Sequence, residues 1–486
     1  MGDHALLEKL GAYTRMKGSG VDWMGAVPEP WQVRPNRALF EEINVREHPE
    51  EQMLSVTIKN GVVPQKLLLE DSSKKDSSNQ DRSAYKLVST GDIVYNKMRA
   101  WQGAIGLSQY KGIVSPAYVV QRPRGVLDGK YVEYLFRTPA FAKEAERWSY
   151  GITSDMWSLR PEHFKMIYAC VPPPDEQRAI VRFLDHMDRK IRKYIRAKQK
   201  LIKLLEEQKQ AIIHRAVTRG LDPNVRLKPS GVEWLGDVPE HWEVVPLKRR
   251  VGFQEGPGIM AADFREHGVP LLRISCLLSS GDPLAGCNFL DPEKVRTKWN
   301  HFLVQPGNYI LNASTSASTV RIFHVKERWI GCVPYTGLIR MWALGTRVSM
   351  AYVALLFGSS VIQEQLLQAR TGVGIAHFGP SHLKRLWLAL PPFEEQVLLL
   401  SELEAAIYQF ERGVAIAQQE ISLIREYRTR LFTDVVTGKL DVCEAAMLLE
   451  DVLVPGELPE EREGQDEADE DVEATELTAV SEETDA

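Results

Sequence analysis

The chain has 486 residues, of which 44% are hydrophobic and 26% are charged. This length exceeds one ordinary core and the composition is globular, so two or more folded domains are expected and a disordered or fibrous protein is excluded. No run of about 18 apolar residues could span a membrane, and the N-terminus lacks a signal-peptide core. The five cysteines are widely spaced without a Cys-x-x-Cys pair, which favours a reducing cytoplasm over disulfides or a zinc cluster.

The formal net charge of −5 is unevenly distributed along the chain. Residues 454–486 hold fourteen acidic residues and one basic residue, which leaves a net charge of +8 on the preceding 453 residues. A mildly basic body permits nucleic-acid binding. The acidic end has no aromatic residue and few large apolar ones, so we expect a disordered tail. Its role is either solubility or DNA mimicry and partner docking.

The chain contains a tandem repeat. Residues 17–33 read KGSGVDWMGAVPEPWQV and residues 228–244 read KPSGVEWLGDVPEHWEV, with eleven of seventeen positions identical. Later segments match in the same order: GDIVYN at 91–96 with GNYILN at 307–312, and PPPDEQ at 172–177 with PPFEEQ at 391–396. The offset stays close to 219 residues, as loop insertions in a duplicated unit would allow.

Each copy mixes short strand-like runs, turn residues and short helical stretches, which predicts an α+β globular unit followed by a long helix. The proline pair and the acidic residues after it suit the first turn of a helix. The expected organisation has seven parts: an N-terminal segment at 1–20, a first domain at 21–172, a long helix at 173–218, a linker at 219–228, a second domain at 229–390, a second long helix at 391–437 and the acidic tail at 438–486.

The long helices carry coiled-coil patterns. Residues 175–218 contain no Pro or Gly, and alternating steps of four and three residues predict this seam: Ile180, Leu184, Met187, Ile191, Tyr194, Lys198, Leu201, Leu205, Gln208, Ile212 and Arg215. The second seam, from Leu399 to Asp434, is weaker and includes Gly413, where glycine costs about 1 kcal/mol relative to alanine.

The two helices have opposite net charges. Residues 175–218 hold twelve basic and six acidic residues, whereas residues 394–437 hold four basic and eight acidic residues. This favours an antiparallel intramolecular pair over pairing between two copies of the chain. Residues 189–203 hold eight basic residues and no acid. Either they form a solvated face that also pairs with the acidic helix, or they contact DNA phosphates, with Arg189, Lys190, Arg192 and Lys193 as candidates.

Known catalytic motifs fail on inspection. Leu390-Pro-Pro-Phe393 resembles the loop of amino-methyltransferases, but leucine cannot accept a hydrogen bond from the target amine, and the repeat assigns this stretch to a helix start. The glycine-rich residues 372–379 lack the strand–turn–helix context of an adenosylmethionine site. The eleven histidines show no metal-ligand spacing, although His163 and His382 are repeat-equivalent and suggest a shared packing or capping role. We therefore predict neither a catalytic nor a metal site.

Two polar segments follow equivalent strands and are candidates for reading DNA bases. Their side chains are donors and acceptors suited to base edges, and the two segments differ although the scaffold repeats. The candidates are Lys97, Arg99, Trp101 and Gln102 in the first copy and Asn312, Ser314, Thr315, Ser316, Ser318, Thr319 and Arg321 in the second. The alternative is ordinary loop divergence.

The repeated Gly-x-x-Trp-x-Gly-x-Val-Pro-x-x-Trp opening, the Pro-Pro-x-x-Glu-Gln helix start and the long helices resemble the HsdS-like specificity (S) subunit of type I restriction–modification systems. The resemblance implies two target-recognition domains joined by an antiparallel coiled coil, each reading half of a bipartite, asymmetric site in double-stranded DNA. It implies that the helices set the spacer and dock two modification (methyltransferase) subunits.

The same resemblance places all catalysis on partner chains. The modification subunits would use adenosylmethionine and flip the target adenine, and restriction subunits would use ATP and magnesium, so no cofactor is expected on this chain. Two other classes stay open: a self-contained methyltransferase or nuclease with a duplicated scaffold, and a coiled-coil adaptor without DNA contact.

Overall fold

The computed structural model describes residues 8–69, 82–151, 157–278, 287–315, 320–368 and 376–449, together with Leu6 and Leu284. Contacts divide the chain into two compact units: unit 1 is Met1–Arg196 with Glu420–Ala486, and unit 2 is Ala197–Gln419. Two long helices, α7 (Pro174–Arg219) and α13 (Phe393–Val436), each contribute one part to either unit. Within the described ranges, no helix is both long and apolar enough to cross a bilayer.

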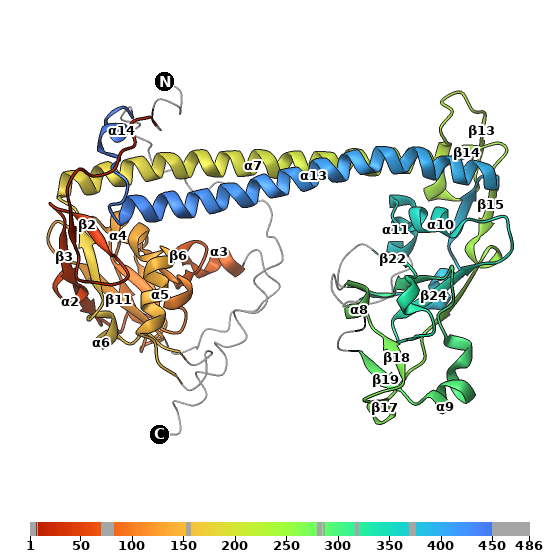
Figure 1. The fold of residues 1–486 in the computed structure, drawn as a ribbon, viewed down its shortest axis with the longest axis horizontal. Coiled ribbons are helices and arrows are strands. Elements are labelled where there is room, and N and C mark those ends of the chain that lie inside the picture. Colours follow the sequence, from red (N-terminus) through yellow and green to blue (C-terminus); the bar gives the residue numbers. More distant parts are fainter. Residues whose placement is uncertain are drawn as a thin grey trace. The chain divides into compact units, whose positions relative to one another are not determined.

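Unit 1 is built around an antiparallel four-stranded sheet in the order β4-β11-β8-β9, of which Figure 1 labels β11. All four residues of the inner strand β8 (Ile93–Asn96) are buried. The other strands are β1 (Met16–Gly18), β2 (Ala26–Pro28), β3 (Gln32–Pro35), β4 (Phe40–Ile43), β5 (Leu54–Thr57), β6 (Gly61–Pro64), β7 (Lys86–Val88), β9 (Ile105–Leu107), β10 (Gly112–Val114), β11 (Tyr118–Pro123) and β12 (Tyr168–Val171). The shorter helices are α2 (Asn36–Leu39), α3 (Gln65–Leu69), α4 (Gly129–Phe136), α5 (Pro139–Arg147), α6 (Pro161–Phe164) and α14 (Cys443–Met447).

Unit 2 repeats this sheet as β16-β24-β20-β22 and adds a second sheet, β17-β19-β18-β23, in which β18 and β23 are parallel. Its strands are β13 (Leu227–Pro229), β14 (Asp237–Pro239), β15 (Glu243–Pro246), β16 (Val251–Glu255), β17 (Phe264–Arg265), β18 (Val269–Leu272), β19 (Asn288–Leu290), β20 (Tyr309–Asn312), β21 (Ser314–Thr315), β22 (Arg321–His324), β23 (Val333–Pro334), β24 (Leu338–Ala343), β25 (Ala376–His377) and β26 (Trp387–Leu390). Its shorter helices are α8 (Ile274–Leu278), α9 (Pro292–Lys294), α10 (Met350–Phe357), α11 (Ser360–Gln368) and α12 (Pro380–Leu383). Mixed helices and strands agree with the expected α+β class.

The repeated tryptophan is held by the first turn of the long helix in each unit. In unit 1 the indole Nε1 of the fully buried Trp31 donates to Glu176 at 2.8 Å. In unit 2 Trp242 donates to Glu395 at 3.0 Å. A hydrogen bond from a buried donor to a carboxylate is among the stronger ones in proteins, so these motif residues have a structural role.

The glutamine next to this glutamate ties the helix to a second element. Gln177 accepts from the backbone N–H of Asp128 at 2.7 Å and donates to the carbonyl of Pro172 at 2.9 Å. Asp128 is itself the N-cap of α4. Gln396 does the same in unit 2, accepting from the N–H of Ser349, the N-cap of α10, at 2.8 Å. The Glu-Gln pair therefore fixes three segments of each unit at once.

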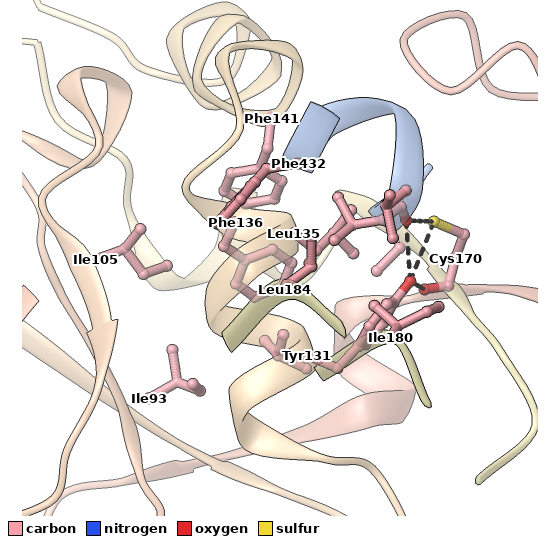
Figure 2. Packing of buried hydrophobic residues seen from close by; sticks show 14 of the residues in the cluster. Ile93, Ile105, Tyr131, Leu135, Phe136, Phe141, Cys170, Ile180, Leu184 and Phe432 are labelled. Atoms are coloured by element: carbon pink, nitrogen blue, oxygen red, sulfur yellow. Dashed lines mark hydrogen bonds between the residues drawn. The ribbon is translucent and has the colours of Figure 1, made fainter. Parts of the chain in front are cut away.

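A buried tyrosine closes the core of unit 1 over the end of α13. The hydroxyl of Tyr131 donates to the carbonyls of Cys170 at 2.9 Å and Val436 at 3.1 Å (Figure 2). Burial raises the pKa of Tyr131 well above its ordinary value and that of the Cys170 thiol to about 11, so both groups stay neutral. Beside them, the rings of Phe136 and Phe141 stack at 4.2 Å between centroids.

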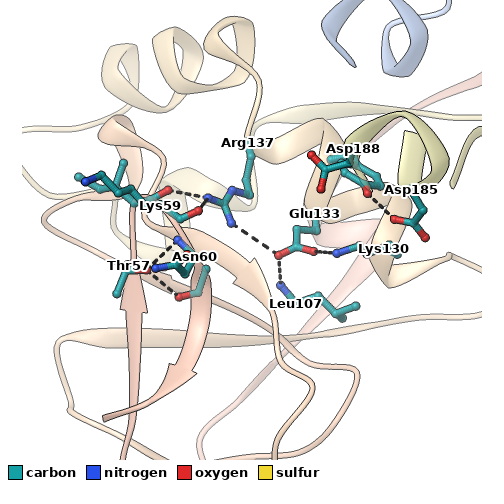
Figure 3. Close-up of polar contacts among 12 residues, drawn as sticks. Thr57, Lys59, Asn60, Leu107, Lys130, Glu133, Arg137, Asp185 and Asp188 are labelled. Atoms are coloured by element: carbon teal, nitrogen blue, oxygen red, sulfur yellow. Dashed lines mark hydrogen bonds and ion pairs between the residues drawn. The ribbon is translucent and has the colours of Figure 1, made fainter. Parts of the chain in front are cut away.

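An ionic network fastens the β5–β6 hairpin of unit 1 to α4. Arg137 donates to the carbonyls of Ile58 and Lys59, both at 2.6 Å, while Glu133 binds Lys130 at 2.6 Å (Figure 3). Burial lowers the pKa of Arg137. The hairpin thus depends on a half-buried guanidinium that binds two backbone oxygens and the Glu133 carboxylate.

The long helices contact each other within each unit. In unit 1 the Nε of Arg428 lies 2.7 Å from the buried carboxylate of Asp188. In unit 2 Gly413 lies against Leu205 and Lys209 pairs with Glu411 at 3.3 Å. Of these two unit 2 contacts, the one that lies later in α7 lies earlier in α13. The two helix segments are therefore antiparallel there.

The predicted seam of α7 is wrong at three positions after Ile191, although Leu205 contacts α13 as the seam predicts. Tyr194 and Leu201 are each 41% exposed and Ile212 is 39% exposed, whereas Ile213 is buried. The inward-facing positions shift by one residue because an α-helix has 3.6 residues per turn, so a strict 3.5-residue repeat drifts off the contact face unless an extra residue is skipped.

The expected tail boundary at residue 438 is also wrong. Val442, Ala445 and Ala446 are buried in the core of unit 1, and Asp441 exchanges backbone hydrogen bonds with Gly11. Apolar residues at spacings of three and four give α14 one buried face. The chain is therefore folded up to Leu449, and the expectation of disorder at 450–486 lies outside the described residues.

We predict that Gln177→Leu and Gln396→Leu each lower the free energy of unfolding by about 2–4 kcal/mol, because backbone groups are left buried without partners. Urea denaturation followed by tryptophan fluorescence measures this in the full chain. Arg178→Leu, at an exposed neighbouring position, is the control. Equal losses in all three variants would contradict the role given to the glutamines.

We also predict that Ala446→Asp destabilises the chain by about 3 kcal/mol or more, because it buries an unpaired carboxylate. Met447→Asp changes a residue that is 77% exposed and should cost less than about 0.5 kcal/mol. Thermal unfolding of both variants compares them directly. If the two melt alike, α14 does not pack as described.

Candidate nucleic-acid interface

Each candidate segment follows the inner strand of its sheet. In both copies one residue at this point donates one backbone hydrogen bond and accepts another, an arrangement called the backbone clamp below. In unit 1 the N–H of Lys97 donates to Ala117 at 3.2 Å, and its carbonyl accepts from Leu159 at 2.9 Å. In unit 2 the N–H of Ala313 donates to Gly337 at 2.8 Å, and its carbonyl accepts from Phe378 at 2.9 Å. The two candidate segments therefore start from one shared scaffold position, which is half-buried at Lys97 and fully buried at Ala313.

In unit 1 the segment 96–103 folds into a compact turn containing the 3₁₀ helix η1 (Ala100–Gln102). The indole of Trp101 donates to the carbonyl of Met98 at 2.9 Å and packs edge-on against Trp157. Arg99 donates to the side-chain oxygen of Gln102 at 3.1 Å. All four candidates are half-buried and lie on this one turn, which gives the arginine and the glutamine defined orientations.

Two further basic residues that sequence reasoning missed lie beside this turn. The Nζ of Lys86 donates to the carbonyls of Tyr118 at 2.7 Å and Pro116 at 3.3 Å, on either side of the residue that binds Lys97. Burial lowers the pKa of Lys86 and the charge of Lys97 lowers it further, while Glu42 acts in the opposite direction and Arg46 adds a smaller lowering. Strand pairing creates this cluster, and no spacing in the sequence signals it.

In unit 2 the ends of the second segment lie opposite each other. Asn312 on β20 is paired with Arg321 on β22, and Arg321 is exposed. The backbone of Ser314 and Thr315 forms β21, which pairs with β25. This pairing brings the end of the glycine-rich stretch 372–379 beside the candidate segment. Ser316, Ser318 and Thr319 lie outside the described residues.

The candidate phosphate contacts lie on the part of α7 in unit 1. Arg189, Lys190, Arg192 and Lys193 are all exposed, while Ile191 between them is buried in the core. Arg192 pairs with Asp188, which also binds Arg428 of α13. Among these four residues, Arg192 is therefore linked through Asp188 to the contact between α7 and α13.

The structure also places the rejected motifs. Leu390 ends β26 and is 3% exposed, and α13 begins at Phe393, so the Leu-Pro-Pro-Phe stretch is a strand end and helix start. His163 and His382 lie in the matching short helices α6 and α12. Among the residues that the structure describes, no group of three or more metal-ligating side chains is present.

The chain is similar to two specificity subunits of Methanocaldococcus jannaschii. It is 22% identical to the type I restriction enzyme MjaVIII specificity subunit over 74% of this chain and 83% of that protein. It is 21% identical to the putative type I restriction enzyme MjaX specificity subunit over 86% of this chain and 96% of that protein. No family model matches the sequence.

The fold is shared with a chain from a solved type I R-M system, with a TM-score of 0.61 at 13% identity, covering 84% of this chain and 98% of that one. The repeated tryptophan and Glu-Gln motifs that suggested the resemblance are the residues that hold each unit together. The resemblance predicted from them is confirmed: the relatives of this chain are type I restriction enzyme specificity subunits.

Proposed function

We propose that this chain is the DNA sequence-specificity subunit of a type I restriction–modification complex. The observation that carries the proposal is the shared backbone clamp at Lys97 and Ala313, from which two polar segments of different sequence leave two copies of one sheet. Sequence readers need hydrogen-bonding side chains that vary on a fixed scaffold. The similarity to specificity subunits over most of the chain supports the same function.

In this proposal residues 21–172 and 229–390 are two target-recognition domains, and each reads one half of a bipartite, asymmetric site in double-stranded DNA. Lys97, Arg99 and Gln102 read the first half-site, and Asn312 and Arg321 contribute to the second. Lys86 adds positive charge beside the first segment, which favours contact with DNA phosphates. Two different segments give two different half-sites.

The long helices act in this proposal as an antiparallel coiled coil that sets the spacer and docks two methyltransferase subunits. Large apolar side chains on these helices are exposed, which is typical of a surface that a partner covers. In unit 2 these are Leu201, Leu204, Ile212, Phe393, Val397, Leu398, Tyr408 and Ile416, and in unit 1 they are Tyr194, Leu423 and Tyr427.

In this proposal the modification and restriction subunits carry out catalysis. The modification subunits would bring adenosylmethionine to a flipped adenine, and restriction subunits would use ATP and magnesium. This chain would contribute binding energy and the position of the DNA, and no chemical step.

We predict that Arg321→Ala alters recognition of one half-site only, because one bidentate arginine contact discriminates bases by about 1–3 kcal/mol. Arg99→Ala should alter the other half-site. Single-molecule sequencing of methylated adenines in cells that express the complex reads both halves together. Arg328→Ala, an exposed arginine of the same unit, is the control. A change in both halves from one substitution would contradict independent reading.

We predict that inserting seven residues after both Lys200 and Gln418 lengthens the spacer and leaves both half-sites unchanged. Seven residues keep the heptad register and add about 10.5 Å of helix, or about three base pairs. The same methylome measurement gives the spacer directly. Seven residues inserted in the exposed loop at 222–224 serve as the control. An unchanged spacer in the helix variant would refute the role of the helices as a ruler.

A further inference from the structure

A stripe of basic residues runs along the face of α7 that points away from the core of unit 1. Arg182, Arg189, Lys193 and Arg196 follow at spacings of seven, four and three residues, so they share one helix face. Arg189, Lys193 and Arg196 are exposed, and Arg182 is half-buried. These four residues, the basic stripe, cover about 21 Å of helix.

Two carboxylates on the same stretch of α7 bind residues outside the basic stripe. Asp185 accepts a hydrogen bond from Tyr134 of α4, and Asp188 binds Arg192 and Arg428. The part of α13 in unit 1, residues 420–436, holds three acidic and three basic residues and so brings no net charge. His186, next to Arg189, has a pKa lowered by burial and then by that arginine. The acidic half of α13 that could balance α7 belongs to unit 2.

The last described residue of the chain contacts the basic stripe. Arg182 donates to the backbone carbonyl of Leu449, the last described residue. Residues 450–486 then contain sixteen acidic residues and one arginine. The described chain therefore ends in contact with one end of a cationic helix face, directly before the acidic segment.

We propose that residues 450–486 lie on the basic stripe of α7 and compete there with the phosphates of DNA. The contact of the tail with the stripe stands independently, whereas the competition rests on the proposed DNA-binding function. The bond from Arg182 to Leu449, the charge complementarity and the length of chain beyond Leu449 carry the proposal.

The length and tethering of the segment suit this role. Thirty-seven residues extend to more than about 100 Å, several times the length of the stripe. A tethered segment acts at an effective concentration on the order of millimolar, so it occupies the stripe until a polyanion with more contacts displaces it. Specific DNA, which also engages the two recognition segments, is favoured over non-specific DNA as the displacing ligand.

Carbodiimide cross-linking of the full chain tests the contact, since this reagent joins carboxylates directly to amines. We expect Lys193, and Lys190 beside the stripe, to couple to peptides from 450–486 at about 0.05 M salt, with yields falling several-fold at about 0.5 M. Lys248, an exposed lysine of unit 2, is the matched control. Equal coupling of the tail to Lys248 and Lys193, or none to Lys190 and Lys193, would overturn the proposal.

Truncation after Leu449 tests the competition, because it removes the tail and keeps the buried residues of α14. We expect the affinity for non-specific duplex DNA to rise about 10-fold at about 0.1 M salt. Arg189→Gln combined with Lys193→Gln should remove most of this gain, and Arg215→Gln, exposed on the same helix, should not. An equal gain in all backgrounds would overturn a site on the stripe.

The two measurements separate the tail contact from the proposed function. Cross-linking to Lys193 without DNA binding by either the full or the truncated chain would support the contact and refute DNA recognition. DNA binding that truncation leaves unchanged would support recognition and refute competition by the tail. A variant with the tail carboxylates changed to amides, at unchanged length, should match the truncation if charge is the cause.

Discussion

The hydrogen bonds made by the Glu-Gln pair at the first turn of each long helix are the constraint on which the rest of the structure depends. The glutamate holds a buried indole, and the glutamine holds the backbone at the N-cap of a short helix. The long helix, the segment that carries the tryptophan and the start of a short helix are thus joined through groups that would be costly to leave unpaired. Because both copies keep these bonds, each unit can vary elsewhere without losing the orientation of its helix.

The far ends of the long helices are held in an equally specific way. Gly438, just after α13, has φ of +74°, and a Cβ there would lie 2.3 Å from Pro28 and 3.1 Å from Trp31. Gly220, just after α7, lies in the same left-handed conformation against Trp242. Each repeated tryptophan therefore contacts the start of one long helix and the end of the other, which makes the fold of each unit depend on both helices.

The sequence predicts the repeated elements well, because their signals are local. The proline pairs mark the starts of α7 and α13, and the buried runs at 93–96 and 309–312 form strands as expected. The residues of α7 that face α13 beyond Ile191 could not all be predicted. The sequence of one helix does not show where the spacing between its contact positions changes from three residues to four. The fold of α14 was hidden by the acidic segment that follows it, although Val442, Ala445 and Ala446 carry its apolar spacing. Lys86 approaches Lys97 only through the pairing of β7, β10 and β11 with their neighbours, which no linear pattern encodes.

The backbone clamp at Lys97 and Ala313 determines which substitutions these positions can accept during evolution. Its four hydrogen bonds use main-chain atoms alone, so these bonds require only that the residue is not proline, which lacks the N–H. Ala313 is also fully buried, so packing keeps the side chain small in that copy. Lysine and alanine already occupy the position in the two copies. Substitutions in one candidate segment can therefore change its binding preference while the other segment keeps its own. Such changes need not destabilise the fold.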